Sequence, residues 1–185
     1  MQIYAKTHKG LVRPTNQDSL LVSHNLYGVA DGMGGHRGGE TASRIAVQVV
    51  RNLLQGKTPE ENSLRISMDA ANRRIFDMQR HELALSGMGT TLTVLWENRA
   101  ELWIAHVGDS RAYLYRDGEL SCQTQDHSVV GELLRNHAIT PAMAKNNKGK
   151  GKPAPKPKLS KIDKWEIDFL KKTIDKHAKI IQRIQ

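Results

Sequence analysis

The 185-residue sequence lacks the features that mark secreted and membrane proteins. Cys122 is its only cysteine, so no disulfide can form within the chain, which fits a reducing compartment. No apolar run approaches the ~18 residues that a membrane span needs, and residues 1–9 contain no apolar stretch long enough for a signal peptide. We therefore predict a cytoplasmic protein without a transmembrane segment.

Most of the chain also lacks net charge. Residues 1–140 contain 15 basic and 15 acidic residues, whereas residues 141–185 contain 13 basic and 4 acidic, so the formal net charge of +9 belongs to the C-terminal tail. Aromatic residues in this tail are limited to Trp165 and Phe169. Base stacking is therefore poorly supported, and we expect no specific nucleic-acid partner. A weak contact with a polyanionic surface remains an alternative to a solvated extension.

The change in composition divides the chain into three parts. Residues 1–140 carry the patterns of a folded domain. Residues 141–159 are rich in proline, lysine and glycine, which predicts a disordered linker. Residues 160–185 show a rough apolar stripe with Ser160 as a candidate cap, which predicts a basic amphipathic helix.

Hydrophobic periodicity predicts both strands and helices within residues 1–140. Residues 40–54 place their apolar side chains on one helical face, and a second helix is predicted from a cap at Ser63 to about Leu85. Asp117-Gly118 predicts a hairpin turn, and Ser128 is expected to cap a short helix. Strands are predicted at 3–12 (with a turn at Gly10), 19–23, 27–30, 90–96, 101–107 and 111–115.

The strongest chemical signal is Asp31-Gly32, which follows an apolar run. A carboxylate beside glycine lets the backbone approach a cation closely, so that the Gly32 carbonyl can be a second oxygen ligand. One aspartate can bridge two metal ions that activate a water. The alternatives are a simple glycine-rich turn and a nucleotide-phosphate loop at 32–39, but that segment lacks the Gly-Lys-Ser/Thr ending and the dinucleotide spacing.

Two further clusters suit the same chemistry. Arg13 offers a guanidinium fork for a phosphate dianion, and Asp18 could hold a metal-bound water directly or through its second shell. Asp109 ends another apolar run and could add an oxygen ligand. The alternatives are a surface arginine beside an Asx turn and a solvated turn aspartate. We place His36 at the rim of the site and assign His127 to the start of a helix.

Five ordered stretches resemble the metal-dependent Ser/Thr protein phosphatase family, protein phosphatase 2C or PPM, in its bacterial form. They are GLVRPTNQDSLLV, GVADGMGGHRGGETAS, GMGTTLTVL, AHVGDSRAYLYRDGEL and QDHSVVGELL. The resemblance implies an α+β fold, here a partial α-β-β-α sandwich of antiparallel sheets flanked by helices.

The resemblance also implies an activity and its site residues. Phosphoserine and phosphothreonine of phosphoproteins, the targets of Ser/Thr kinases, would be hydrolysed by a water activated at two or three Mg²⁺ or Mn²⁺ sites. By position, Arg13 binds phosphate, Asp31 bridges the metals and Gly32 offers its carbonyl. Asp18 acts through metal-bound water, and Asp109 serves an additional, weaker metal site.

The sequence departs from the family pattern in two places. Met33 stands where eukaryotic members have a histidine. The later Ser-Asp-Gly and Asp-Asn motifs that carry two further metal aspartates are absent from the sequence. We therefore expect a C-terminally truncated phosphatase of weakened activity, with an unrelated or frame-shifted segment at 141–185. The alternatives are a catalytically inactive homologue and a polyanion-binding protein that acts through its tail.

Overall fold

The computed structural model describes residues 2–34, 38–98 and 101–127. These form two compact units: residues up to 111 together with 124–127, and a smaller unit whose described part is 112–123. The expected helix at Ser128, the linker at 141–159 and the basic helix at 160–185 lie outside the described residues, as does His36. No described helix combines the length and apolarity needed to cross a bilayer.

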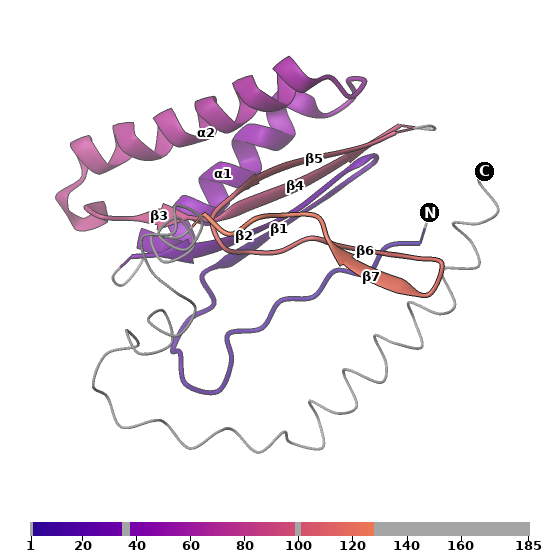
Figure 1. The fold of residues 1–185 in the computed structure, drawn as a ribbon. Coiled ribbons are helices and arrows are strands. Elements are labelled where there is room, and N and C mark those ends of the chain that lie inside the picture. The colour runs from indigo at the N-terminus through magenta and orange to yellow at the C-terminus, as the bar shows by residue number, and fades with distance from the viewer. Residues whose placement is uncertain (1, 35–37, 99–100, 128–185) are drawn as a thin grey trace, which may run out of the picture. The chain divides into compact units, whose positions relative to one another are not determined.

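An antiparallel sheet forms the centre of the first unit. Its strands are β1 (Asp18–Ser23), β2 (Leu26–Met33), β4 (Leu92–Glu97) and β5 (Leu102–Val107), in the order β1-β2-β4-β5 (Figure 1). The short strand β3 (Gly89–Thr90) pairs with the end of β2, with Gly32 opposite Thr90. The C-terminal end of β2 therefore has β1 on one side and β3 on the other.

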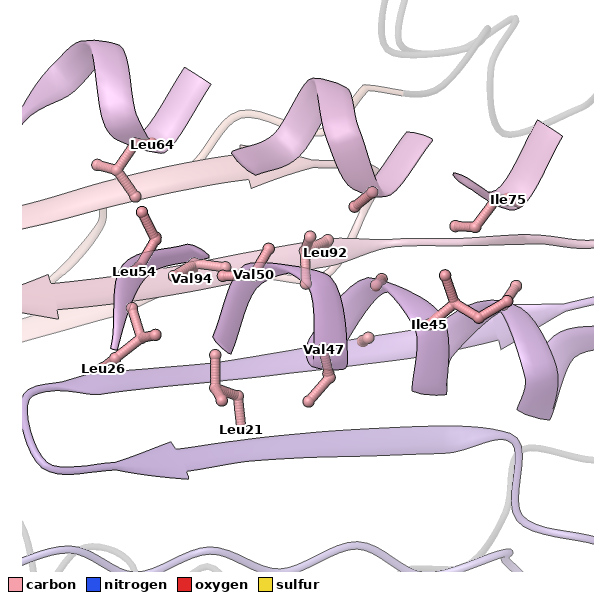
Figure 2. Close-up of a cluster of buried hydrophobic side chains, with 14 of the residues drawn as sticks. Leu21, Leu26, Ile45, Val47, Val50, Leu54, Leu64, Ile75, Leu92 and Val94 are labelled. Atoms are coloured by element: carbon pink, nitrogen blue, oxygen red, sulfur yellow. The ribbon is translucent and has the colours of Figure 1, made fainter. Parts of the chain in front are cut away.

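Two helices cover one face of this sheet (Figure 1). Helix α1 (Gly38–Leu54) packs on β1, β2 and helix α2 (Glu61–His81), and α2 also contacts β5. The apolar face predicted for residues 40–54 is the buried face of α1. The core side chains of α1 point toward the sheet and α2 (Figure 2). The fully buried core side chains of the whole unit include Leu21, Leu26, Val50, Leu54, Val94 and Trp96. This packing fixes α1 against the strands that carry the candidate site.

The described part of the second unit is a hairpin of β6 (Tyr113–Arg116) and β7 (Glu119–Cys122). Asp117 and Gly118 connect the strands with φ of 54° and 86°. These values match the two-residue turn that suits the right-handed twist of a hairpin. The predicted Asp117-Gly118 turn is confirmed.

The α+β class with antiparallel sheets is also confirmed, but several boundaries were wrong. Residues 3–12 form no strand: residues 2–9 are irregular and 10–12 form a turn. The side chains of Leu11 and Val12 are fully or almost fully exposed. No described strand lies beside this segment to pair with it, and a strand-like sequence without a partner strand does not make a sheet.

The second helix differs at both ends from the prediction. It begins at Glu61, with Glu60 as the extended N-cap residue, so Ser63 lies in the first turn and its hydroxyl group donates to Glu60 Oε2 at 2.9 Å. It ends at His81, and the remaining turn is a 3-10 helix, η1 (Leu83–Leu85). The strand predicted at 111–115 begins at Tyr113.

Candidate metal and phosphate site

Asp18 and Asp31 lie directly opposite each other on β1 and β2. Asp18 is the first residue of β1, and Asp31 lies two residues before the end of β2. Opposed residues on adjacent antiparallel strands bring their side chains together, and here the two carboxyl groups reach hydrogen-bonding contact. The strand register therefore builds a pair of carboxylates from residues 13 positions apart in the chain.

Arg13 and Asp109, in addition to Asp18, influence the pKa of Asp31. Desolvation raises the pKa of the Asp31 carboxyl, and the charge and hydrogen bond of Asp18 raise it further. The charge of Arg13 lowers this pKa, and the charge of Asp109 adds a smaller increase. All three neighbours are thus near enough to influence Asp31, and the structure brings Arg13, Asp18, Asp31 and Asp109 into one electrostatic cluster.

Gly32 lies where three backbone segments meet. Its N–H donates to the Gln17 carbonyl at 3.2 Å. A Cβ atom at position 32 would come within 2.0 Å of the Gly39 carbonyl oxygen and 2.6 Å of the Gln17 carbonyl oxygen. Only glycine allows this approach, which places the beginning of α1 beside the end of β2. The sequence predicted a close approach of the Gly32 backbone to a cation, and both that approach and the role of its carbonyl as a ligand stay predictions.

Several polar residues position Asp18. The Thr7 hydroxyl donates to Asp18 Oδ2 at 3.0 Å, and the Asp18 N–H donates to Asn16 Oδ1 at 3.1 Å. Ser43 of α1 is fully buried, and its hydroxyl donates to the Gln17 carbonyl at 2.7 Å. The helix therefore fixes the backbone immediately before Asp18.

Asp109 lies in a loop after β5 that is also tied down. Arg111 makes a bidentate ion pair with Asp126, with N–O distances of 2.8 and 2.6 Å. The His127 N–H donates to the Gly108 carbonyl at 2.7 Å, and its ring lies 5.1 Å from that of His106. The helix that His127 was predicted to start lies outside the described residues.

Two hydroxyl residues that connect these segments were not predicted from the sequence. Thr91 binds both Asp31 and Ser110, and Ser43 binds Gln17. Both lie in motif stretches quoted above, GMGTTLTVL and GVADGMGGHRGGETAS. The signal that could have found them was a hydroxyl residue placed next to apolar core positions, where its oxygen needs a partner.

The donor set fits a hard divalent cation in part. Carboxylate and carbonyl oxygens are the ligands that Mg²⁺ and Mn²⁺ prefer, and two carboxyl groups in contact have an unfavourable charge that a cation would neutralise. However, no group of three His, Cys, Asp or Glu side chains suitable for a metal occurs among the described residues. Asp18 and Asp31 would hold the cation, with Asp109 farther away.

Known proteins match most of this chain. The family model of protein phosphatase 2C matches residues 8–141. The chain is 39% identical over 142 residues to the serine/threonine protein phosphatase PstP of Mycobacterium tuberculosis, covering 76% of this chain and 28% of that protein. It is 37% identical over 153 residues to the serine/threonine phosphatase stp of Listeria welshimeri, covering 77% and 61%.

Solved structures show the same similarity. A crystal structure of the M. tuberculosis phosphatase PstP matches with a TM-score of 0.70 and 37% identity over 77% of this chain and 62% of that one. The PstP catalytic domain in complex with two manganese ions matches with a TM-score of 0.68 and 38% identity over 75% and 61%. The chain therefore belongs to the protein phosphatase 2C family of metal-dependent Ser/Thr phosphatases, and it spans less than two thirds of the length of each of these relatives.

Proposed function

We propose that the chain is a protein serine/threonine phosphatase that requires Mg²⁺ or Mn²⁺ and hydrolyses phosphoserine and phosphothreonine of phosphoproteins. The observation that carries the proposal is the opposition of Asp18 and Asp31 across β1 and β2, with the charges of Arg13 and Asp109 acting on the same carboxyl group. Membership of the family supports the reaction class. When bound, such a cation polarises a phosphoryl oxygen and acidifies a water.

Each site residue has a role that its chemistry supports. Asp31 and Asp18 supply anionic oxygen ligands, and the Gly32 carbonyl lies at the same strand end. Arg13 would bind two phosphate oxygens through its planar fork. Because the charge of Arg13 acts on Asp31, the bound phosphate would lie near the cation. Asp109 would serve an additional, weaker cation site. The phosphate and the cation would thus be held side by side.

We expect the activity of this chain to be low. Two carboxylates in contact provide less charge than a pair of divalent cations needs, and the described residues contain no third metal-binding side chain beside them. An inactive homologue that still binds metal or phosphopeptide is therefore the nearest alternative. The cytoplasmic location also stays a prediction from the sequence.

Hydrolysis of p-nitrophenyl phosphate at saturating Mn²⁺ tests the proposal. We expect a slow, Mn²⁺-dependent rate that is lost in Asp31→Asn and in Arg13→Ala. Asp117→Asn is the matched control, because Asp117 lies in the β6–β7 turn at positive φ, which asparagine accepts readily. A rate that is independent of Mn²⁺, or equal in Asp31→Asn and the control, would contradict the proposed function. A rate of ~1–10³ s⁻¹, typical of enzymes, would contradict the expected weakness alone.

A further role is proposed for the tail. Its 13 basic and 4 acidic residues stand apart from a neutral domain, so binding to polyanions would be independent of sequence and sensitive to salt. We also propose the division into a phosphatase-type part at 1–140, a linker at 141–159 and a basic helix at 160–185.

A further inference from the structure

Thr91 connects to Asp31 through both its backbone and its side chain. It lies between β3 and β4. The Thr91 N–H donates to the Asp31 carbonyl at 2.9 Å, and the Asp31 N–H donates to Thr91 Oγ1 at 2.9 Å. In a regular antiparallel pair both of these bonds would be between backbone groups. Here a side-chain oxygen replaces the backbone carbonyl as the acceptor for the Asp31 N–H.

The same side chain also contacts the residues on both sides of Asp109. Thr91 Oγ1 lies 2.7 Å from Ser110 Oγ, within a hydrogen bond. Gly108, with φ of 107°, packs so closely on the Thr91 side chain that a Cβ atom there would lie 2.6 Å from Thr91 Cγ2. The hydroxyl and the methyl group of one threonine thus contact the two neighbours of Asp109.

We infer that Thr91 is a positioning residue that sets the separation between the Asp31 and Asp109 carboxylates. Asp31 lies in β2 and Asp109 in the loop after β5, and the side chain of Thr91 contacts both segments. Its oxygen can accept from the Asp31 N–H and still bond to Ser110, because a hydroxyl has one proton and two lone pairs. The inference rests on the proposed function, in which both carboxylates bind cations.

Serine and valine separate the two halves of this role. Thr91→Ser keeps the hydroxyl and loses the methyl group, whereas Thr91→Val keeps the shape and loses both side-chain hydrogen bonds. Thr93→Val is the matched control: Thr93 is buried in β4, and its Oγ1 bonds to His106 Nδ1 at 2.9 Å. It loses a similar bond that reaches neither Asp31 nor Ser110. Ser110→Ala removes the Ser110 bond alone.

Mn²⁺ titration of the full chain by calorimetry tests the inference. Loss of an outer-shell partner typically weakens metal binding 10- to 100-fold, so we expect Thr91→Val to weaken it by about 10-fold or more. Ser110→Ala should weaken it less, and Thr91→Ser and Thr93→Val should stay within about 3-fold of the wild type. Equal binding by Thr91→Val and the wild type, or an equal loss in Thr93→Val, would overturn the inference.

A metal-free measurement separates this inference from the proposed function. In Thr91→Val the Asp31 amide loses its acceptor, so its hydrogen exchange should accelerate about 10-fold or more, and the Ser110 amide resonance should shift. Neither change is expected in Thr93→Val. If the wild type bound no Mn²⁺, the proposed function would fail, and the exchange rate of the Asp31 amide would still decide for or against Thr91. Should Thr91→Val not fold, Ser110→Ala decides: its Mn²⁺ binding should be weaker than that of Thr93→Val, and equal binding by these two variants would overturn the inference.

Discussion

Replacing Gly32 with alanine is the most severe test of how the site is packed. A Cβ atom there would lie 2.0 Å from the Gly39 carbonyl oxygen, 2.4 Å from the Gly39 carbonyl carbon and 2.6 Å from the Gln17 carbonyl oxygen. All three atoms belong to the backbone, so the rotation of a side chain cannot relieve the clash. The methyl group fits only if the beginning of α1 or the segment before β1 moves.

The size of the effect follows from this geometry. Overpacking a rigid interior usually costs about 1–3 kcal/mol and occasionally more. Because the closest contact is far shorter than a van der Waals distance and involves backbone on two sides, we expect about 3 kcal/mol or more. For a domain of this size that corresponds to a fall in Tm of about 10 °C or more.

Thermal melting followed by circular dichroism measures the change, with Gly56→Ala as the matched control. Gly56 has a φ of 78° but no atom within 4 Å of a Cβ at that position, so the same substitution costs only backbone strain, about 1–2 kcal/mol. A Gly32→Ala protein that melts as high as Gly56→Ala would refute the reasoning. It would mean that α1 and Gln17 move apart easily and do not fix the end of β2.

Individual contacts give three further predictions. Ser43→Ala removes the hydroxyl that bonds to Gln17 and Ser19, so chemical denaturation should show a free energy of unfolding lower by about 1–2 kcal/mol. Ser67→Ala is the control, because the buried Ser67 hydroxyl bonds to the Leu64 carbonyl three residues earlier in the same helix, and it should cost less. An equal cost in both variants would contradict the role of Ser43 in connecting α1 to the segment before β1. Burial and, after it, the hydrogen bond to Glu97 raise the pKa of Tyr27 to about 12. Because the folded state keeps the phenol neutral, this contribution to stability should be complete below pH ~10 and be lost toward pH ~12. Melting temperatures across this pH range should therefore fall less steeply in Tyr27→Phe than in the wild type. Deleting residues 141–185 should abolish retention on heparin at low salt without changing Mn²⁺ affinity, and unchanged retention would place the basic surface within residues 1–140.

The parts of the molecule that the sequence predicted are those fixed by local pattern. The apolar spacing in residues 40–54 identified the buried face of α1, and the Asp117-Gly118 pair identified its hairpin. Each signal needs only neighbours within a few positions. Asp31 and Asp109 were found in the same way, since each follows an apolar run.

The parts that it missed depend on partners far away in the chain. The Asp31–Thr91 bond joins residues 60 positions apart, and the Ser43–Gln17 bond joins residues 26 apart. A lone threonine or serine in a strand or helix gives no sign of which backbone group it will meet. The failed strand at 3–12 has the same origin, because a strand needs a partner that its own sequence does not name.

The opposition of Asp18 and Asp31 gives a last prediction that separates stability from function. Like charges directly opposite each other on neighbouring strands destabilise a sheet, and burial together with the Asp18 charge raises the pKa of Asp31, which shows that its charged form is disfavoured in the fold. Asp31→Asn removes this repulsion, and the amide can donate to Asp18. The metal-free variant should therefore melt above the wild type at neutral pH.

Adding Mn²⁺ should reverse that order. A ligand at 100 times its Kd stabilises the folded state by about 2.7 kcal/mol, and this gain should occur in the wild type and in Asp117→Asn but not in Asp31→Asn. Melting curves with and without Mn²⁺ measure both effects. If Asp31→Asn were the less stable protein without metal, the carboxylate would be a structural group of the sheet. If the wild type melted below Asp31→Asn without metal and above it with Mn²⁺, the sheet would tolerate this charge pair because a cation binds there.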